Sequence, residues 1–176
     1  MNLNYFIVFI YIMDLKLLIL NIIGGSLVIL SYIIYLPMIR KNNVSLNAMW
    51  GQIKGIERDL TYVSMIASAI AFLYVLHHLI TKKRKNTKTL YLGFTVFFIG
   101  AILWAPLLYY YFLNKSHFRA SLMVTALCVT SLGAILILLS LYCQERTNYV
   151  LLTVYSIFFF HILYLDNVNY GSRFIN

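Results

Sequence analysis

Residues 90–114 read LYLGFTVFFIGAILWAPLLYYYFLN, an uncharged stretch long enough to cross a lipid bilayer as a helix. At about 1.5 Å per residue, Trp104 would lie roughly 15 Å from the C-terminal end of this helix, near the middle of a hydrocarbon core of about 30 Å. Tryptophans of membrane proteins usually lie at the interface instead. Two residues on, Pro106 removes a backbone donor, so we expect a kink beside the indole and a pocket wall there. The alternative is that Trp104 only packs against a neighbouring helix and that the spanning helix tolerates Pro106.

The composition of the whole chain predicts an integral membrane protein. Of its 176 residues 62% are hydrophobic and only five are acidic, and several long runs contain no charge. The net charge of +9 arises mainly from basic residues in short connectors, where membrane topology and anionic lipid headgroups account for them. We therefore expect the lipid bilayer, and not a nucleic acid, as the partner of these residues. Which membrane holds the protein is left open.

The apolar runs divide the chain into five predicted transmembrane helices that form one domain, residues 1–176. Short connectors between them favour antiparallel neighbours in a single all-α bundle. The opening run NLNYFIVFIYIM lacks a basic segment and a small-residue cleavage site, so we expect no cleaved signal peptide. The predicted spans are about 17–39, 60–81, 89–114, 120–144 and 147–165.

Two of the predicted spans carry ridges of small residues. Such ridges let helix backbones approach closely inside a membrane, where lipid offers no competing selectivity. We therefore expect these faces to contact other helices of the bundle, a second copy of the chain or other membrane proteins. The ridges are Ser64, Ala67, Ser68 and Ala71 in the second span, and Ala126, Thr130, Gly133 and Ala134 in the fourth.

The first connector, residues 42–59, shows the periodicity of a short amphipathic helix. Apolar residues recur at three- and four-residue steps from Leu46 to Leu60 and include Trp50, although Gly51 and Gly55 weaken the helix. We predict an interfacial helix. It could act as a lid over a cavity between helices, or it could simply anchor the loop at the membrane surface.

Several chemistries are not expected. The predicted spans contain no Asp, Glu, Lys or Arg, so no carboxylate is available to couple transport to protons or sodium. No Cys/His cluster has metal-ligand spacing, and no serine lies in a nucleophile motif. We therefore predict neither an enzyme nor an energised transporter, and no metal or covalent cofactor. His161 lies close to the predicted end of the fifth span, and we expect a structural role for it.

The chain resembles the translocator protein (TspO/MBR, peripheral benzodiazepine receptor) family over most of its length. The layout of five spans with a long first connector is similar, and residues 104–107, Trp-Ala-Pro-Leu, look like the family's W-S-P-L-F-F stretch in the third helix. Residues 62–65 resemble its Y-x-x-M, and Tyr149 followed by Asp166-Asn167 resembles its fifth helix. The chain departs from the family where polar residues precede the tryptophan, because Ala101 and Phe97 stand there.

The resemblance implies a binding protein for a lipophilic small molecule, such as a tetrapyrrole or a sterol, held between the helices under the first connector. Trp104 and Pro106 would line the site, Trp50 would lie in the lid, and Tyr32, Tyr35 and Tyr62 are further candidates. Two alternatives remain. One is a structural or assembly protein without a small-molecule site; the other is a small-solute transporter, because residues 36–38, Leu-Pro-Met, resemble the Pro-Gln turn of PQ-loop proteins.

The positive-inside rule predicts the orientation of the bundle. The densest basic run, Lys82 to Lys88, lies in the second connector. This connector should therefore lie on the cytoplasmic side of the membrane, or on the equivalent uptake side, together with the N-terminus and opposite the C-terminus. A cysteine introduced at Asn86 should not react with a membrane-impermeant thiol reagent added to intact cells, with the unmodified protein as control for Cys128 and Cys143. Labelling at position 86 from outside would reverse the orientation.

Overall fold

The fold is an all-α bundle in a computed structural model that describes residues 14–49, 51–81, 88–143 and 148–175. The first four long helices are α2 (Leu15–Lys41), α4 (Gly55–Thr81), α5 (Lys88–Leu113) and α6 (His117–Tyr142). The fifth is continuous through α7 (Tyr149–Phe160), η1 (His161–Gly171) and α8 (Ser172–Ile175). The short helix α3 (Leu46–Met49) lies in the first connector.

Within the described residues, five helices are long and apolar enough to cross a membrane, which confirms the predicted class, an all-α multi-pass membrane protein. The first, third and fourth observed helices lie close to the predicted ranges. The second begins earlier, at Gly55, and the predicted end of the fifth at Leu165 is too early, because this helix continues through Ile175. The opening run, residues 1–13, lies outside the described residues.

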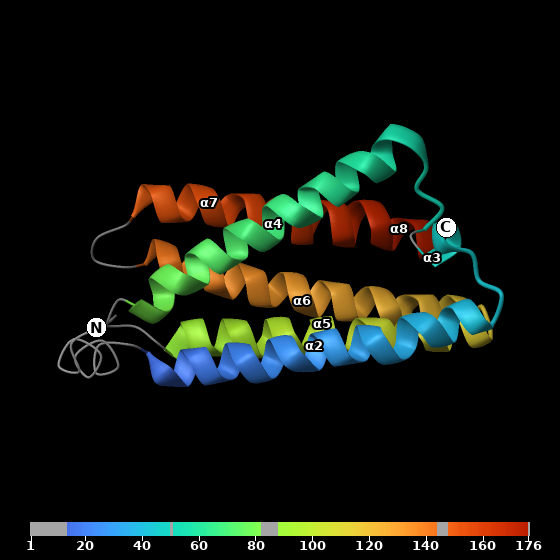
Figure 1. The fold of residues 1–176 in the computed structure, drawn as a ribbon, viewed down its shortest axis with the longest axis horizontal. Helices are drawn as coiled ribbons and strands as arrows, with labels where there is room; N and C mark the ends of the chain where they lie inside the picture. The colour runs from blue at the N-terminus through green and yellow to red at the C-terminus, as the bar shows by residue number, and fades with distance from the viewer. Residues whose placement is uncertain (1–13, 50, 82–87, 144–147, 176) are drawn as a thin grey trace, which may run out of the picture.

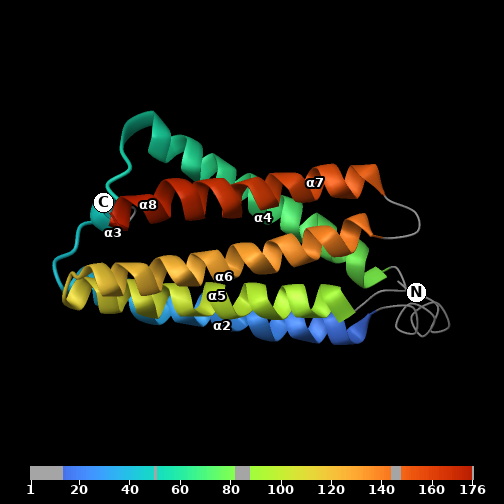
Figure 2. The same ribbon diagram turned by 180° about the vertical axis from the view of Figure 1, so that it is seen from behind.

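Helices α2, α5 and α6 run side by side along the long axis of the bundle, while α4 crosses obliquely over the fifth helix (Figures 1 and 2). Helix α4 packs chiefly on α7, and α2 packs chiefly on α5. As a result α2 and α4 scarcely touch, although they are consecutive long helices in the chain. The short helix α3 and the C-terminal end lie together at one end of the bundle, and α2 begins at the other (Figure 1).

Glycines allow α5 and α6 to approach so closely that no side chain fits between them. A Cβ atom at Gly133 would collide with the backbone of Phe97, and one at Gly100 would collide with Thr130 and the carbonyl oxygen of Ala126. A Cβ atom at Gly93 would lie 2.9 Å from the backbone nitrogen of Ile137. The small face predicted for the fourth span is therefore a helix contact, as expected. In the ridge of the second span, Ser68 and Ala71 are buried but Ala67 is exposed.

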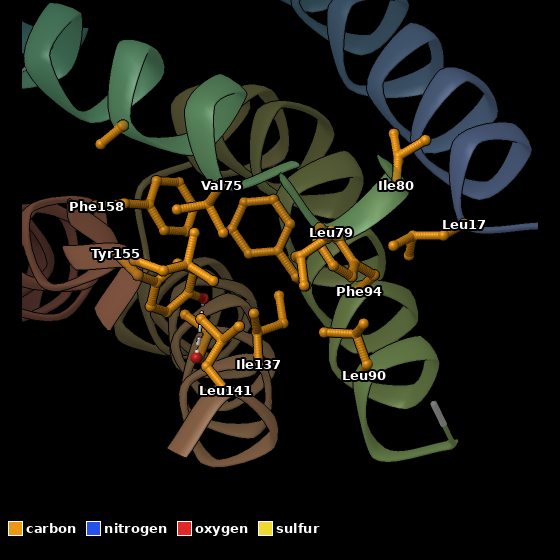
Figure 3. Close-up of a cluster of buried hydrophobic side chains, with 14 of the residues drawn as sticks. Leu17, Val75, Leu79, Ile80, Leu90, Phe94, Ile137, Leu141, Tyr155 and Phe158 are labelled. Atoms are coloured by element: carbon orange, nitrogen blue, oxygen red, sulfur yellow. Dashed lines mark hydrogen bonds between the residues drawn. The ribbon is translucent and has the colours of Figure 1, made fainter. Parts of the chain in front are cut away.

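One buried cluster of apolar side chains fills the end of the bundle where α2 begins (Figure 3). Tyr155 belongs to this cluster and donates a hydrogen bond of 3.0 Å to the carbonyl oxygen of Ala134. Asp14 joins three helices here: its carboxylate accepts hydrogen bonds from the Leu17 amide, 3.0 Å, and the Tyr91 hydroxyl, 2.6 Å. Its own amide donates to the carbonyl oxygen of Ile80, 2.8 Å.

The first connector forms a shorter helix than its periodicity predicts. The helix α3 is a single turn. The chain then takes positive φ at Gly51 and Gln52, which interrupts helical geometry, and again at Gly55, the first residue of α4. The apolar periodicity has a different origin, because Met49 and Ile53 are buried against the second core cluster, which contains Trp104. The connector therefore packs onto the end of the bundle.

The contact between α5 and α6 leads to a prediction about stability. Gly133→Ala should destabilise the protein by about 1–3 kcal/mol, because the added methyl group forces the backbones of α5 and α6 apart. Gly25→Ala is the matched control, since a Cβ there meets nothing within 4 Å and the change favours helix formation. Thermal unfolding in detergent measures both. Equal melting temperatures for the two variants would contradict the contact.

Candidate functional site

A cavity of about 590 Å³ lies inside the bundle, between the two core clusters. This volume falls within the range of about 300–1,000 Å³ that is typical of small-molecule sites. Each of the five long helices contributes to the lining, and Ile53 contributes from the first connector. The lining is mostly apolar and rich in aromatic rings: Tyr32, Phe72, Phe97, Phe98, Trp104, Phe158 and Tyr170.

Trp104 stands between two tyrosines that line the same cavity. Its ring centroid lies 5.3 Å from that of Tyr32, with the planes at 65°, and 6.0 Å from that of Tyr170, with the planes at 56°. Both distances are those of favourable edge-on or tilted aromatic pairs. Trp104 is 8% exposed, and its indole Nε1 has no hydrogen-bond partner among the described residues. Trp104 therefore packs in the core and lines the cavity at once.

Only some of the candidate site residues predicted from the sequence line this cavity. Trp104 and Tyr32 line it, whereas Pro106, Tyr35 and Tyr62 are not among its lining residues. Tyr35 instead pairs with Tyr109, at 5.8 Å between ring centroids, and Tyr62 is 43% exposed. Pro106 lies inside α5, which continues past it as a helix. Trp50 lies outside the described residues.

The imidazole and the carboxylate that line the cavity, those of His161 and Asp166, both come from η1, the π-helical part of the fifth helix. In an α-helix, residues five apart lie about 140° from one another around the axis. In a π-helix, the hydrogen bonds join residues five apart, so such residues stack one above the other. This geometry places the imidazole Nε2 of His161 3.4 Å from a carboxylate oxygen of Asp166, and both side chains line the cavity.

His161 is held between Asp166 and α4. Its Nδ1 lies 2.9 Å from the hydroxyl oxygen of Ser64, and its side chain is only 5% exposed. If Nδ1 accepts the Ser64 proton, Nε2 carries the ring's own proton and points it at Asp166. In that tautomer the imidazole is neutral, and the negative charge of the pair stays on Asp166, whose side chain is 33% exposed.

The presence of Asp166 corrects one exclusion made from the sequence. The spans were predicted to contain no acidic residue because the fifth was ended at Leu165. The helix that can cross the membrane extends from Tyr149 to Phe174 and includes Asp166. The prediction failed because Asp166, Asn167 and Asn169 favour the end of a helix, whereas contacts with other helices keep this stretch helical. An ionisable residue inside a span is a candidate for a functional role.

Hydrogen bonds tie η1 to its neighbours on three sides. The amide of Asn167 donates to the hydroxyl of Ser131 on α6, at 3.2 Å, and the amide of Asn169 donates to Glu57 on α4, at 3.2 Å. The hydroxyl of Tyr170 donates to the carbonyl oxygen of Met49, at 2.7 Å, which joins η1 to the first connector. Glu57 also pairs with Arg173. The connector is thus bonded to the helix that carries Asp166.

From the sequence we expected a structural role for His161, and the predicted fifth span ended one residue before Asp166. The spacing of five brings these two side chains together only in a π-helix, which helical and strand periodicities do not predict. Within the part of the chain that the structure describes, no three His, Cys, Asp or Glu residues are arranged to hold a metal ion.

Comparisons of the chain with family models, curated proteins and solved structures give no match. The fold and the cavity together define an all-α multi-pass membrane protein with an aromatic chamber between its helices. The resemblance to the translocator protein family stays a prediction.

Proposed function

We propose that this membrane protein binds a lipophilic small molecule in the cavity beside Trp104, without a chemical step. The observation that carries the proposal is the cavity itself, about 590 Å³ in volume and lined by aromatic rings from several helices. A bundle built only for assembly would gain van der Waals contacts by filling this space. The family resemblance independently favours a lipophilic ligand.

The bilayer is the natural source of such a ligand. Ile29 on α2 and Leu73 on α4 both border the cavity, and each is more than 60% exposed. Because α2 and α4 scarcely touch, the side of the cavity between these two helices is bordered by largely exposed apolar side chains. A hydrophobic molecule dissolved in the membrane can therefore reach the cavity between these two helices without crossing a polar surface.

The lining distinguishes the two ligand classes that the resemblance implies. Within the part of the chain that the structure describes, it contains Asp166 but no Lys or Arg. The carboxylates of a tetrapyrrole such as protoporphyrin IX would therefore lie near a group of like charge, without a Lys or Arg partner. In a desolvated site this arrangement lowers the affinity. A sterol has no such charge, and its flat apolar skeleton suits the aromatic walls. Within the proposal, the cavity favours a sterol over a tetrapyrrole.

Tyr32 and Tyr35, three positions apart on α2, provide a matched test of the site, because only Tyr32 lines the cavity. Tyr32→Leu and Trp104→Leu should each weaken binding of a fluorescent sterol severalfold, because losing an aromatic contact costs about 1 kcal/mol. Tyr35→Leu should leave the affinity unchanged, since Tyr35 is not among the lining residues. The measurement is a titration of purified protein in nanodiscs, repeated with protoporphyrin IX.

The titration separates the proposal from its rival. Saturable binding that weakens in Tyr32→Leu and Trp104→Leu but not in Tyr35→Leu supports the cavity as the site. Binding that is absent, or that responds equally to all three changes, contradicts it. The assembly function would then be the better account of the bundle.

Filling the cavity is a second test, again with a matched control on one helix. Ala69 lines the cavity and Ala67 does not, and both are exposed alanines of α4. Ala69→Phe should reduce sterol affinity tenfold or more by occupying the ligand's volume, about 1.4 kcal/mol. Ala67→Phe should bind as the unmodified protein does. Equal affinities for both variants in the same nanodisc assay would place the ligand elsewhere.

A further inference from the structure

Among the described residues, no Lys or Arg side chain lies beside the carboxylate of Asp166 in the cavity. The lining contains neither residue type, and Arg173, farther along the same helix, pairs with Glu57 instead. The nearest group that can carry a positive charge is His161, at 3.4 Å, a distance longer than a strong charge-assisted hydrogen bond. A charged carboxylate in an apolar site is costly unless a cation accompanies it.

The contacts of His161 are compatible with a neutral imidazole, which would not serve as the cation that accompanies Asp166. If Ser64 donates to Nδ1, the imidazole is neutral and its Nε2 donates toward Asp166. A neutral imidazole orients the carboxylate without cancelling its charge. Because the side chain of Asp166 is 33% exposed and lines the cavity, its charge is accessible to a molecule bound there.

Aromatic rings near the same end of the cavity add to its preference for a cation. Tyr32, Trp104 and Tyr170 line the cavity together with Asp166, and the Trp104 ring is steeply inclined to both tyrosine rings. Tyr32 and Tyr170 are close enough to Asp166 to interact with it electrostatically. The face of an aromatic ring attracts a cation, tryptophan most strongly, and several rings around one carboxylate form a site suited to a large, weakly hydrated cation.

The rest of the lining is apolar, apart from the hydroxyl-bearing Thr61, Ser68 and Thr130. Phe72, Phe97 and Phe158 contact one another, with ring centroids 5.2 to 6.2 Å apart, and belong to or pack against the first core cluster. Trp104 and Tyr170 belong to the second core cluster. The cavity therefore has a phenylalanine end suited to hydrocarbon and an end where a carboxylate stands among mixed aromatic rings.

We infer that the cavity selects a lipophilic cation, such as a hydrophobic amine or a quaternary ammonium or phosphonium ion, whose charge lies beside Asp166 and whose hydrocarbon part lies among the phenylalanines. This inference rests on the proposed function, because it names the ligand class of the same cavity. It runs against the overall electrostatics of the chain, since a net charge of +9 attracts anions. A preference for a cation would thus have to come from the cavity.

Two probe ions of nearly equal size and opposite charge test the inference, tetraphenylphosphonium and tetraphenylborate. Purified full-length protein in phosphatidylcholine nanodiscs should bind the phosphonium saturably and in preference to the borate, with empty nanodiscs as the blank. Asp166→Asn should weaken phosphonium binding at least tenfold. Asp59→Asn is the matched control, because this exposed aspartate of α4 pairs with Arg58 and does not line the cavity.

The outcomes distinguish this inference from the proposed function. Retained binding of a fluorescent sterol by Asp166→Asn shows that the variant folds. Equal phosphonium affinity in Asp166→Asn and the unmodified protein overturns the inference. A preference of the unmodified protein for tetraphenylborate also overturns it, and this result needs no variant. If the sterol binds and the phosphonium does not, the cation inference alone fails; if neither binds, the proposed function fails with it.

Discussion

The close approach of α5 and α6 is the constraint on which the rest of the bundle depends. Gly93 and Gly100 on α5, with Gly133 on α6, bring the two backbones into contact, so these helices form a rigid pair. The first helix, α2, adds to one side of the pair, where Gly24 accepts the ring of Phe98. The fifth helix adds to α6 on the other side. A pair this tight leaves no space for ligand between its own members, so any chamber must lie beside it.

The chamber follows from where α4 packs. This helix rests on α7 and not on α2, its predecessor in the chain, so the bundle stays open between α2 and α4. Aromatic side chains from the neighbouring helices border the opening but do not fill it. The two core clusters stabilise the ends of the bundle. At one end, the hydrogen bond from Tyr170 to Met49 joins the fifth helix to the first connector. Asn169 and Arg173 bind Glu57 at the start of α4. The helices around the cavity are thus held in place by packing and hydrogen bonds at the ends of the bundle.

The π-helical segment gives this cavity its polarity. An α-helix would turn Asp166 away from His161, and the carboxylate would then lack the imidazole that orients it. Side-chain hydrogen bonds from Asn167 to Ser131 and from Asn169 to Glu57 hold the segment in place against α6 and α4. The less favourable hydrogen-bond geometry of a π-helix is thereby offset by tertiary contacts, and such segments often accompany functional sites.

The sequence by itself determined the class of the protein and most of its helices, because long uncharged runs have no other stable form than a spanning helix. It also indicated Trp104 and the small face of α6, since mid-bilayer tryptophan and helical small-residue spacing are local signals. Tyr32 was a candidate only through the family resemblance. Only the tertiary structure decided that Tyr35, Tyr62 and Pro106 lie outside the cavity lining, that the first connector forms one helical turn before α4, and that Asp166 lies within the fifth helix. Those outcomes depend on how helices distant in the chain pack together, and on hydrogen bonds across more than thirty residues of sequence such as that from Asn167 to Ser131, which the periodicity of a single segment does not encode.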